Sequence, residues 1–340
     1  MSRRTWTLLV SMVLIAIFGA LGGVGTVPFV ALGPGPTYDT LGSVDGQTVI
    51  SIVGHETYPT GGRLNMTTVS VGTELTLFAA LGKWLSGRYA LVPREEIFPP
   101  NRTEDQVQQE QAKAFQDSEA FAETAALAYL KYPMRVIVNR VLTNAPAQGK
   151  LEPGDRLIAV NGRPVSGADQ VREALADTRP GQVVEVRYQR GPATSTAMIT
   201  LGGRDDRQSG FLGVEPANEP DVPFNIKISL GDVGGPSAGL MFALAIVDKL
   251  TPGELNGGQF VAGTGEITSE GQVGPIGGIP FKMVAAREAG ATTFLVPADN
   301  CVEAAQRTPE GLRLVKVGTL TDAVQALDTL RTGGDPPSCG

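Results

Sequence analysis

The feature that most constrains this chain is a long uncharged, apolar run near its N-terminus. After Arg3 and Arg4 the next charged residue is Asp39, and the segment between them contains WTLLVSMVLIAIFGALGGVGTVPFVAL. About 20 apolar residues span the hydrocarbon core of a bilayer. The run is longer than the roughly 7–15 residues of a signal-peptide core, and its exit lacks a clean small-x-small cleavage site. We therefore predict an uncleaved transmembrane anchor within residues 1–32.

Charge on either side of this run predicts its orientation. Arg3 and Arg4 precede it, and acidic residues follow it. By the positive-inside rule the N-terminus is then cytoplasmic and the rest of the chain lies outside. Residues 33–37, GPGPT, are expected to be a short, stiff linker between membrane and domain. The predicted localisation is the cell membrane, with a single span and an extracytoplasmic folded part.

Length and charge limit the classes of protein that remain. The 340 residues suffice for about two domains. The net charge is −7 and no basic cluster is present, whereas a phosphate-binding surface needs grouped Lys and Arg. We expect protein or peptide partners and a membrane, and no nucleic acid.

Cysteine and histidine are scarce. Without a CxxC or Cys/His cluster, no metal site and no cofactor are predicted. Outside the cytoplasm Cys301 and Cys339 could pair, and two free thiols are the alternative. His55 is the only histidine, so a Ser-His-Asp site would have to use it, whereas a Ser-Lys site would not. We interpret His55 as a surface or structural residue.

The stretch from Met134 to Leu201 has a character of its own. A strand, RVIVNRVL, leads into APAQGKLEPGDRLIAVNGRPV, an amphipathic helix and a pair of strands. This order resembles a PDZ domain, which implies a mainly-β domain over 132–203. Such domains bind an extended peptide as an added strand. The resemblance implies a groove between helix 168–177 and strand 135–142, with a carboxylate-binding loop near 132–134 that here lacks glycine. A PDZ fold used only as a spacer is the alternative.

After Gly203 strands alternate with helices, a pattern typical of an α/β domain. Within it the turn GDVGGPSAGL precedes an apolar segment that reads as a buried helix. Ser237 would lie at the junction, where free backbone N–H groups point outward. That position suits a reactive hydroxyl, and it equally suits a plain N-cap.

Lys282 is unusual for its neighbourhood. It lies near the start of a predicted helix, in PIGGIPFKMVAAREAG, among apolar residues. The helix dipole and poor solvation both lower the pKa of an amine held there. A neutral amine can take a proton from a serine hydroxyl, whereas an ammonium cannot.

Together GGPSAGL, TGEIT and GQVGPIGGIPFKMVAA resemble, in order and spacing, the proteolytic domain of Lon proteases. The resemblance implies that Ser237 is the nucleophile, Lys282 its base and Thr264 a residue that assists the lysine. Backbone N–H groups near Gly235 and Ser237 are the expected oxyanion donors. ATP-dependent Lon enzymes have an acidic residue where this chain has Gly234, so we predict no acidic third member.

The resemblance also predicts the domain order. Residues 60–72 and 115–130 resemble weaker versions of the elements that open the Lon domain, which implies that the PDZ segment is inserted. The predicted Lon-like parts are then 33–131 and 204–332, before a flexible tail at 333–340. Within the first part, residues 91–118 are expected to form an exposed charged loop together with a polar helix. The whole resembles the membrane-anchored, PDZ-containing Lon-like proteases of bacteria.

The function implied is that of an ATP-independent serine endopeptidase that cleaves unfolded or extended extracytoplasmic chains, and the family implies a homo-oligomer. No Walker A motif is present, because Gly-Lys pairs are followed by Trp84 and Leu151 rather than Ser or Thr. Two alternatives stay open: an inactive tethered PDZ scaffold, and a phosphate-binding domain like that of a small-molecule kinase.

Overall fold

The computed structural model describes residues 3–204, 207–231 and 233–340, which divide into two compact units. The first unit contains the residues up to Ser51 together with Glu56–Ala122 and Ile226–Gly340. The second contains Ile52–His55 and Glu123–Asn225. The second unit therefore lies within the sequence of the first.

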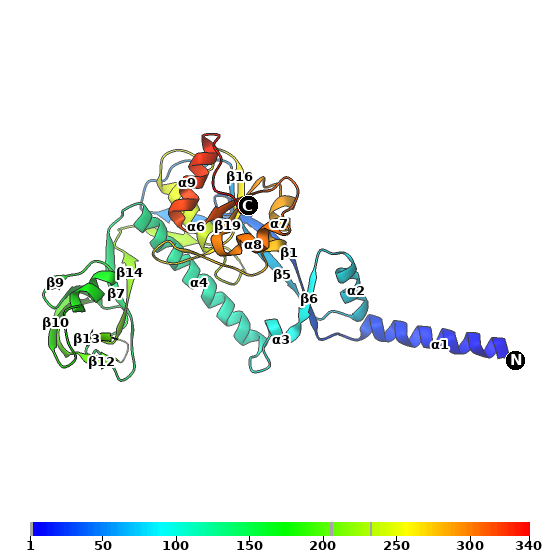
Figure 1. Cartoon of the computed structure of the whole chain (residues 1–340), viewed down its shortest axis with the longest axis horizontal. Coiled ribbons are helices and arrows are strands. Elements are labelled where there is room, and N and C mark those ends of the chain that lie inside the picture. The colour runs from blue at the N-terminus through cyan, green and yellow to red at the C-terminus, as the bar shows by residue number, and fades with distance from the viewer. Residues whose placement is uncertain (1–2, 205–206, 232) are drawn as a thin grey trace. The chain divides into compact units, whose positions relative to one another are not determined.

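A six-stranded mixed sheet of order β20-β19-β16-β5-β1-β6 organises the first unit. The strands β5, β16, β19 and β20 run parallel, and β1 pairs antiparallel with β5 and β6. Figure 1 shows α6, α7, α8 and α9 gathered around this sheet. Every residue of α6 from Gly239 to Asp248 is buried, which explains why that segment is apolar nearly all round.

The elements that lie wholly or partly in the first unit have these bounds: α1 Arg3–Val24, β1 Phe29–Asp39, β2 Ser43–Val44, β3 Gln47–Thr48, β4 Ile50–Val53, β5 Arg63–Gly72, α2 Leu77–Leu85, β6 Ala90–Pro93, α3 Arg94–Ile97, α4 Glu104–Tyr129, β15 Asn225–Ile228, α6 Gly239–Leu250, β16 Phe260–Gly263, β17 Glu266–Ile267, β18 Val273–Gly274, α7 Ile279–Glu288, β19 Thr293–Pro297, a 3-10 turn Ala298–Asn300, α8 Cys301–Ala305, β20 Arg313–Val317 and α9 Leu320–Arg331. The two elements β4 and α4 continue into the second unit, and β15 begins in it.

The apolar N-terminal run forms α1, a 22-residue helix with a mean hydropathy of 2.4 over its most apolar window. Its side chains are almost all exposed. Among the helices of the described residues it alone is long and apolar enough to cross a membrane.

Three segments differ from the expectation drawn from the sequence. The expected linker 33–37 lies inside β1, where the register with β5 shifts between Pro34 and Thr37 and so accommodates prolines that cannot donate to the ladder. The stretch 91–118, expected to be an exposed loop plus a polar helix, contains the end of β6 and the short helix α3 before the 26-residue helix α4 begins at Glu104. The expected flexible tail is bound to the fold, because Cys339 forms a disulfide with Cys301 and Lys316 N–H donates to Pro337 O at 2.9 Å.

The second unit is built on an antiparallel sheet of order β11-β10-β8-β7-β14, with β9 paired to β8. The helix α5 packs against it, and the apolar residues between them form a continuous core. The unit extends past the expected 132–203, because β14 completes its sheet. The bounds are β7 Met134–Val141, β8 Arg156–Val160, β9 Arg163–Pro164, α5 Ala168–Leu175, β10 Val183–Arg190, β11 Ala193–Thr200, β12 Gly202–Arg204, β13 Arg207–Phe211 and β14 Val214–Pro220.

Candidate active site

Ser237 lies just before α6 and is not its N-cap. The N-cap is Ala238, and no side chain caps the helix there. The Ser237 hydroxyl is directed to Lys282 instead, with Oγ and Nζ 2.7 Å apart. The structure therefore separates the two interpretations of this serine and brings its hydroxyl to an amine.

Lys282 comes from the first turns of α7 and is only 3% exposed. The helix follows Gly278, whose φ of 72° is a left-handed conformation that favours glycine. A Cβ at Gly278 would also meet Val69 at 2.8 Å. This tight turn starts α7 against β5 and aims the lysine inward.

Thr264 is fully buried and joins the pair. Its hydroxyl donates to Ser237 O at 3.0 Å, and its oxygen accepts from Lys282 Nζ at 2.9 Å. Because the hydroxyl proton is used on the carbonyl, only the lone pairs face the lysine. The N–H of Gly265 also donates to Ser237 O, at 2.9 Å, so the serine backbone is held from the same strand end.

The environment of Lys282 favours a neutral amine. Burial lowers the pKa of Lys282 from its ordinary 10.5 to about 8, and the negative charge of Glu266 opposes this only in part. A neutral amine can donate to Thr264 and still direct its lone pair at the Ser237 hydroxyl. The site can therefore move a proton from serine to lysine near neutral pH.

The two backbone N–H groups that were expected to bind an oxyanion have different surroundings in this structure. The N–H of Gly235 donates to the main-chain oxygen of Gln111, at 2.9 Å, and is thus engaged within the fold. Gly235 could serve an oxyanion only if that bond broke. The backbone at Ser237, by contrast, stands at the start of α6, where the helix dipole favours negative charge.

Three residues that support the site were missed from the sequence. Ser118 of α4 donates to Pro236 O at 2.9 Å, which ties the serine loop to that helix. Gln111 accepts from the same loop, as described above. Asn300 bonds both backbone groups of Ile276, at 2.8 and 2.9 Å, and so fixes the turn before α7. These contacts join distant parts of the chain, and no local pattern indicates them.

A cavity of about 430 Å³ opens over the hydroxyl–amine pair. Its walls include β1, β5, α4, the loop before α6 and the turn before α7. Several of the lining residues are apolar, among them Met66, Val69 and Ile276. A concave, partly apolar site with a few convergent polar groups is the usual form of a substrate pocket. The cavity can therefore admit a side chain or a short extended segment beside Ser237.

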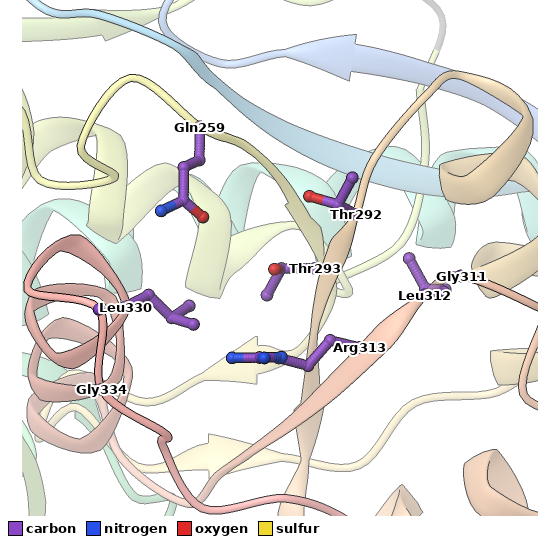
Figure 2. Close-up of a pocket in the computed structure, with 9 residues that line it drawn as sticks. Gln259, Thr292, Thr293, Gly311, Leu312, Arg313, Leu330 and Gly334 are labelled. Carbon is purple, nitrogen blue, oxygen red and sulfur yellow. The ribbon is translucent and has the colours of Figure 1, made fainter.

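A larger concavity of about 610 Å³ lies between β19, β20 and the end of α9. Figure 2 shows the Arg313 side chain extending through it toward Leu330, with Thr292 and Thr293 on the strand beside it. Arg313 pairs with Asp335 at 3.5 Å. The residues that line this concavity include neither serine nor lysine, so its walls assemble no Ser-Lys pair.

His55 belongs to an aromatic cluster of the second unit. Its Nε2 lies 2.9 Å from the hydroxyl of Tyr132, and its ring meets Phe224 edge-on with centroids 4.5 Å apart. These contacts indicate a structural role for His55.

The structure does not allow the peptide groove that was expected between helix 168–177 and strand 135–142 of the second unit. Strand β7, close to the expected 135–142, is paired on both sides, with β8 and with β14, so it cannot accept another strand. Among the described strands of this sheet, β14 is the outer one on that side. It lies beside α5, because Asn218 accepts from Ala168 N–H at 2.8 Å. Sequence reasoning missed this because β14 follows all the recognised PDZ strands.

The outer edge of β14 is short of donors. Odd-numbered residues face β7, since Gly213 O accepts from Leu142 and Asp221 N–H donates to Pro133. Residues in an antiparallel strand alternate in direction, so even-numbered ones face outward. Two of these are Pro216 and Pro220, which have no N–H, and the outward donors left are at 214 and 218.

Two family models match the chain. Residues 215–328 match the Lon protease (S16) C-terminal proteolytic domain, and residues 106–201 match the PDZ domain. The chain is 35% identical over 163 residues to Lon protease 1 of Bacillus subtilis (strain 168), covering 43% of this chain and 21% of that protein. It is 40% identical over 91 residues to Lon protease of Heliobacterium modesticaldum, covering 26% and 11%.

A solved structure is also similar to part of the second unit. The PDZ domain of the SdrC-like protein from Listeria monocytogenes is 23% identical, with 23% of this chain and 83% of that chain covered and a TM-score of 0.22. The chain spans about a fifth of the length of the first curated relatives it matches.

Proposed function

Because this chain carries the proteolytic domain of the Lon serine peptidases together with a PDZ domain, as its sequence predicted, we propose that it is a serine endopeptidase. In this proposal Ser237 is the nucleophile and Lys282 is the general base. The observation that carries it is the 2.7 Å approach of a buried amine to a serine hydroxyl. Burying a lysine lowers the stability of the fold, because its charged form is poorly solvated there. Such residues are often found at functional sites, and a base beside a nucleophile is one such function.

The proposed reaction is acyl transfer to water. Lys282 Nζ takes the hydroxyl proton as Ser237 Oγ attacks a peptide carbonyl, and the ammonium then protonates the leaving amine. Water gives a proton to the same amine as it attacks the acyl carbon, and the ammonium returns that proton to Ser237 Oγ as the acyl–oxygen bond breaks and the acid product leaves. Thr264 holds the amine in line by accepting one of its N–H groups. The start of α6 favours the negative charge that develops on the substrate oxygen.

We further propose that the protein is anchored by α1 and works outside the cytoplasm. The helix is long enough to span, and positive charge precedes it. The Cys301–Cys339 disulfide supports the same compartment, because disulfides persist where the surroundings are oxidising. ATP is scarce there, in keeping with a chain that lacks a Walker A motif. Unfolded or locally extended proteins are the proposed substrates.

The PDZ domain is proposed to contact extended peptides through β14 rather than through β7. The open edge of β14 beside α5 supports this, and its two outward prolines limit it to few backbone bonds. The domain would therefore present substrate loosely to the protease or adjust its access.

Activity-based labelling tests the central proposal. The full-length protein in detergent should react with a fluorophosphonate and should degrade casein without ATP. Ser237→Ala should abolish both, and Lys282→Ala should do the same while the serine is still present. Thr308→Ala, which removes a hydroxyl bonded to Ala304 O away from the site, is a matched control that should keep activity.

The two alternatives predict different results. An inactive scaffold would take no label at Ser237 although it binds peptides. A phosphate-binding domain would be protected against heat by nucleotide, whereas the proposed peptidase would not. Casein cleavage that persists unchanged in Ser237→Ala would contradict the assignment of the nucleophile.

A further inference from the structure

The helix α2, Leu77–Leu85, exposes its apolar side. Its large apolar residues are each between 47% and 70% exposed, and they are Leu77, Phe78, Leu81, Trp84 and Leu85. At 3.6 residues per turn these five fall within an arc of about 120°. The opposite arrangement is usual for a globular protein, in which the apolar stripe of a surface helix faces the core.

The side of α2 that does face the fold is small. Ala80 is buried against Ala31 and Leu75, and it is the one buried residue of the helix. Lys83 lies over the ring of Tyr89, with Nζ 3.9 Å from its centroid. Lys83 is also the only charged residue in the helix. A helix with a wide apolar face, no acidic residue and one lysine at its flank fits a lipid surface.

The start of α2 is fixed at the level where α1 ends. Thr76, its N-cap, forms a β-bridge with Thr26, and Val27 N–H donates to Leu75 O at 2.8 Å. The ring of Phe78 packs so closely on Gly22 of α1 that a Cβ there would meet it at 2.7 Å. Figure 1 shows α2 beside the C-terminal end of α1. The apolar face of α2 is thus continuous with the apolar surface of α1.

The two tryptophans of the chain agree with this placement. Trp6 lies near the start of α1 and Trp84 lies on α2. From Trp6 to the end of α1 the helix rises about 27 Å, close to the hydrocarbon thickness of a bilayer. Tryptophan is enriched at both interfaces of a membrane. Each tryptophan would therefore lie at one interface.

We propose that α2 is an interfacial helix that buries Phe78, Leu81 and Trp84 in the outer leaflet, beside the point where α1 leaves the membrane. This inference rests on the proposed anchoring by α1 and is independent of the chemistry at Ser237. It gives the first unit a second attachment to the bilayer. The domain would then be held at the lipid surface and not merely tethered to it.

Fluorescence quenching tests the proposal with the full-length chain in vesicles of phosphatidylcholine and phosphatidylglycerol. In Trp6→Phe the only tryptophan is Trp84, and excitation at the red edge of the absorption band selects it over the tyrosines. We expect its emission at shorter wavelength than that of free tryptophan, and a loss of intensity when the lipids carry bromine on the upper part of the acyl chain. Long-wavelength emission without quenching would overturn the proposal.

Matched variants separate the possible failures. In Trp84→Phe the remaining Trp6 reports on α1 alone, so quenched Trp6 with unquenched Trp84 would refute the role of α2 and leave the anchor intact. Unquenched emission from both would refute the anchor as well. When Trp6 and Trp84 are both replaced by Phe, Ala79→Trp puts a single tryptophan on the opposite side of α2. There we expect clearly weaker quenching.

A second copy of the chain is the competing occupant of this face. Nanodiscs that each hold one protein molecule distinguish it from lipid. If Trp84 is shielded only when several copies share a bilayer, and lipid bromines do not quench it, the face is an interface between copies and the proposal is wrong. Quenching that is equal in single-copy nanodiscs and crowded vesicles would support it.

Discussion

Lys282 Nζ and Ser237 Oγ lie 2.7 Å apart, although 45 positions separate the two residues in the sequence. Both stand near the starts of helices, Ser237 just before α6 and Lys282 in the first turns of α7. A helix start carries partial positive charge, so two of them near one amine oppose its protonation. The same feature of the fold therefore makes the amine easier to deprotonate and favours a negative oxygen on the substrate.

We expect activity to rise with pH through about 8. The pKa of Lys282 is lowered to about 8 by burial, and only the neutral amine can accept the serine proton. The value of kcat/KM for a peptide substrate should increase about tenfold per pH unit well below the pKa and level off above it. Circular dichroism at each pH provides the control for unfolding. A profile that is flat across this range would contradict Lys282 as the base.

Lys282→Met should stabilise the fold at neutral pH while it abolishes activity. The pKa of Lys282 in the folded state lies below its ordinary 10.5, so holding the charged lysine in the fold costs free energy of folding. This cost is at its full size below pH 8. It disappears as the pH rises from about 8 to about 10.5. We expect a gain of roughly 1–3 kcal/mol in the free energy of unfolding at pH 7. Urea denaturation at neutral and at alkaline pH measures it, and the gain should shrink at the higher pH.

Thr264→Val should slow catalysis without removing nucleophile or base. The variant deprives Lys282 of one acceptor and Ser237 O of one donor, both inside a fully buried cluster. A bond of this kind is worth about 1.5–3 kcal/mol, so kcat should fall roughly 10- to 100-fold. Thr264→Ser keeps the hydroxyl and should restore most of the rate. A positioning role also predicts a shift of the pH profile in Thr264→Val, which a merely structural loss would not produce.

Reduction of the Cys301–Cys339 disulfide should destabilise the C-terminal part of the first unit. The bond closes a loop of 38 positions and holds the tail beside β20. A cross-link over a loop of this length contributes about 2–4 kcal/mol. Urea denaturation with and without dithiothreitol measures the difference. The double variant Cys301→Ser/Cys339→Ser should match the reduced protein and should not respond to reductant, whereas an unchanged midpoint after complete reduction would contradict the prediction.

The parts of the site that sequence reasoning located have strong local causes. A glycine-rich turn before an apolar helix marks Ser237, and a lysine among apolar neighbours marks Lys282. The alternation of strands and helices after Gly203 was also readable, because apolar residues recur there at regular spacing, as they do in α9. These features depend on neighbours in the sequence, which a reader of the sequence can see.

The misread segments depend on distant partners. GPGPT has the composition of a linker, yet pairing with β5 makes it part of a strand, and the bulge relieves its prolines. The charged stretch 91–118 was expected to begin as an exposed loop, yet the end of β6 and the helix α3 lie at its start. Its polar helix was readable, because Glu and Gln are good helix formers. The outer strand of the PDZ domain could not be read locally, since β14 pairs with β7 from the far end of the domain in the sequence.

The two outward prolines of β14 have a consequence for neighbouring molecules. Open strand edges of identical proteins tend to pair with one another and cause aggregation. Such pairing becomes more frequent when the proteins diffuse in one plane. Pro216 and Pro220 interrupt any such ladder, because each replaces a donor that the opposing strand would need. If many copies share one bilayer, this edge therefore resists pairing with the same edge of a neighbouring copy.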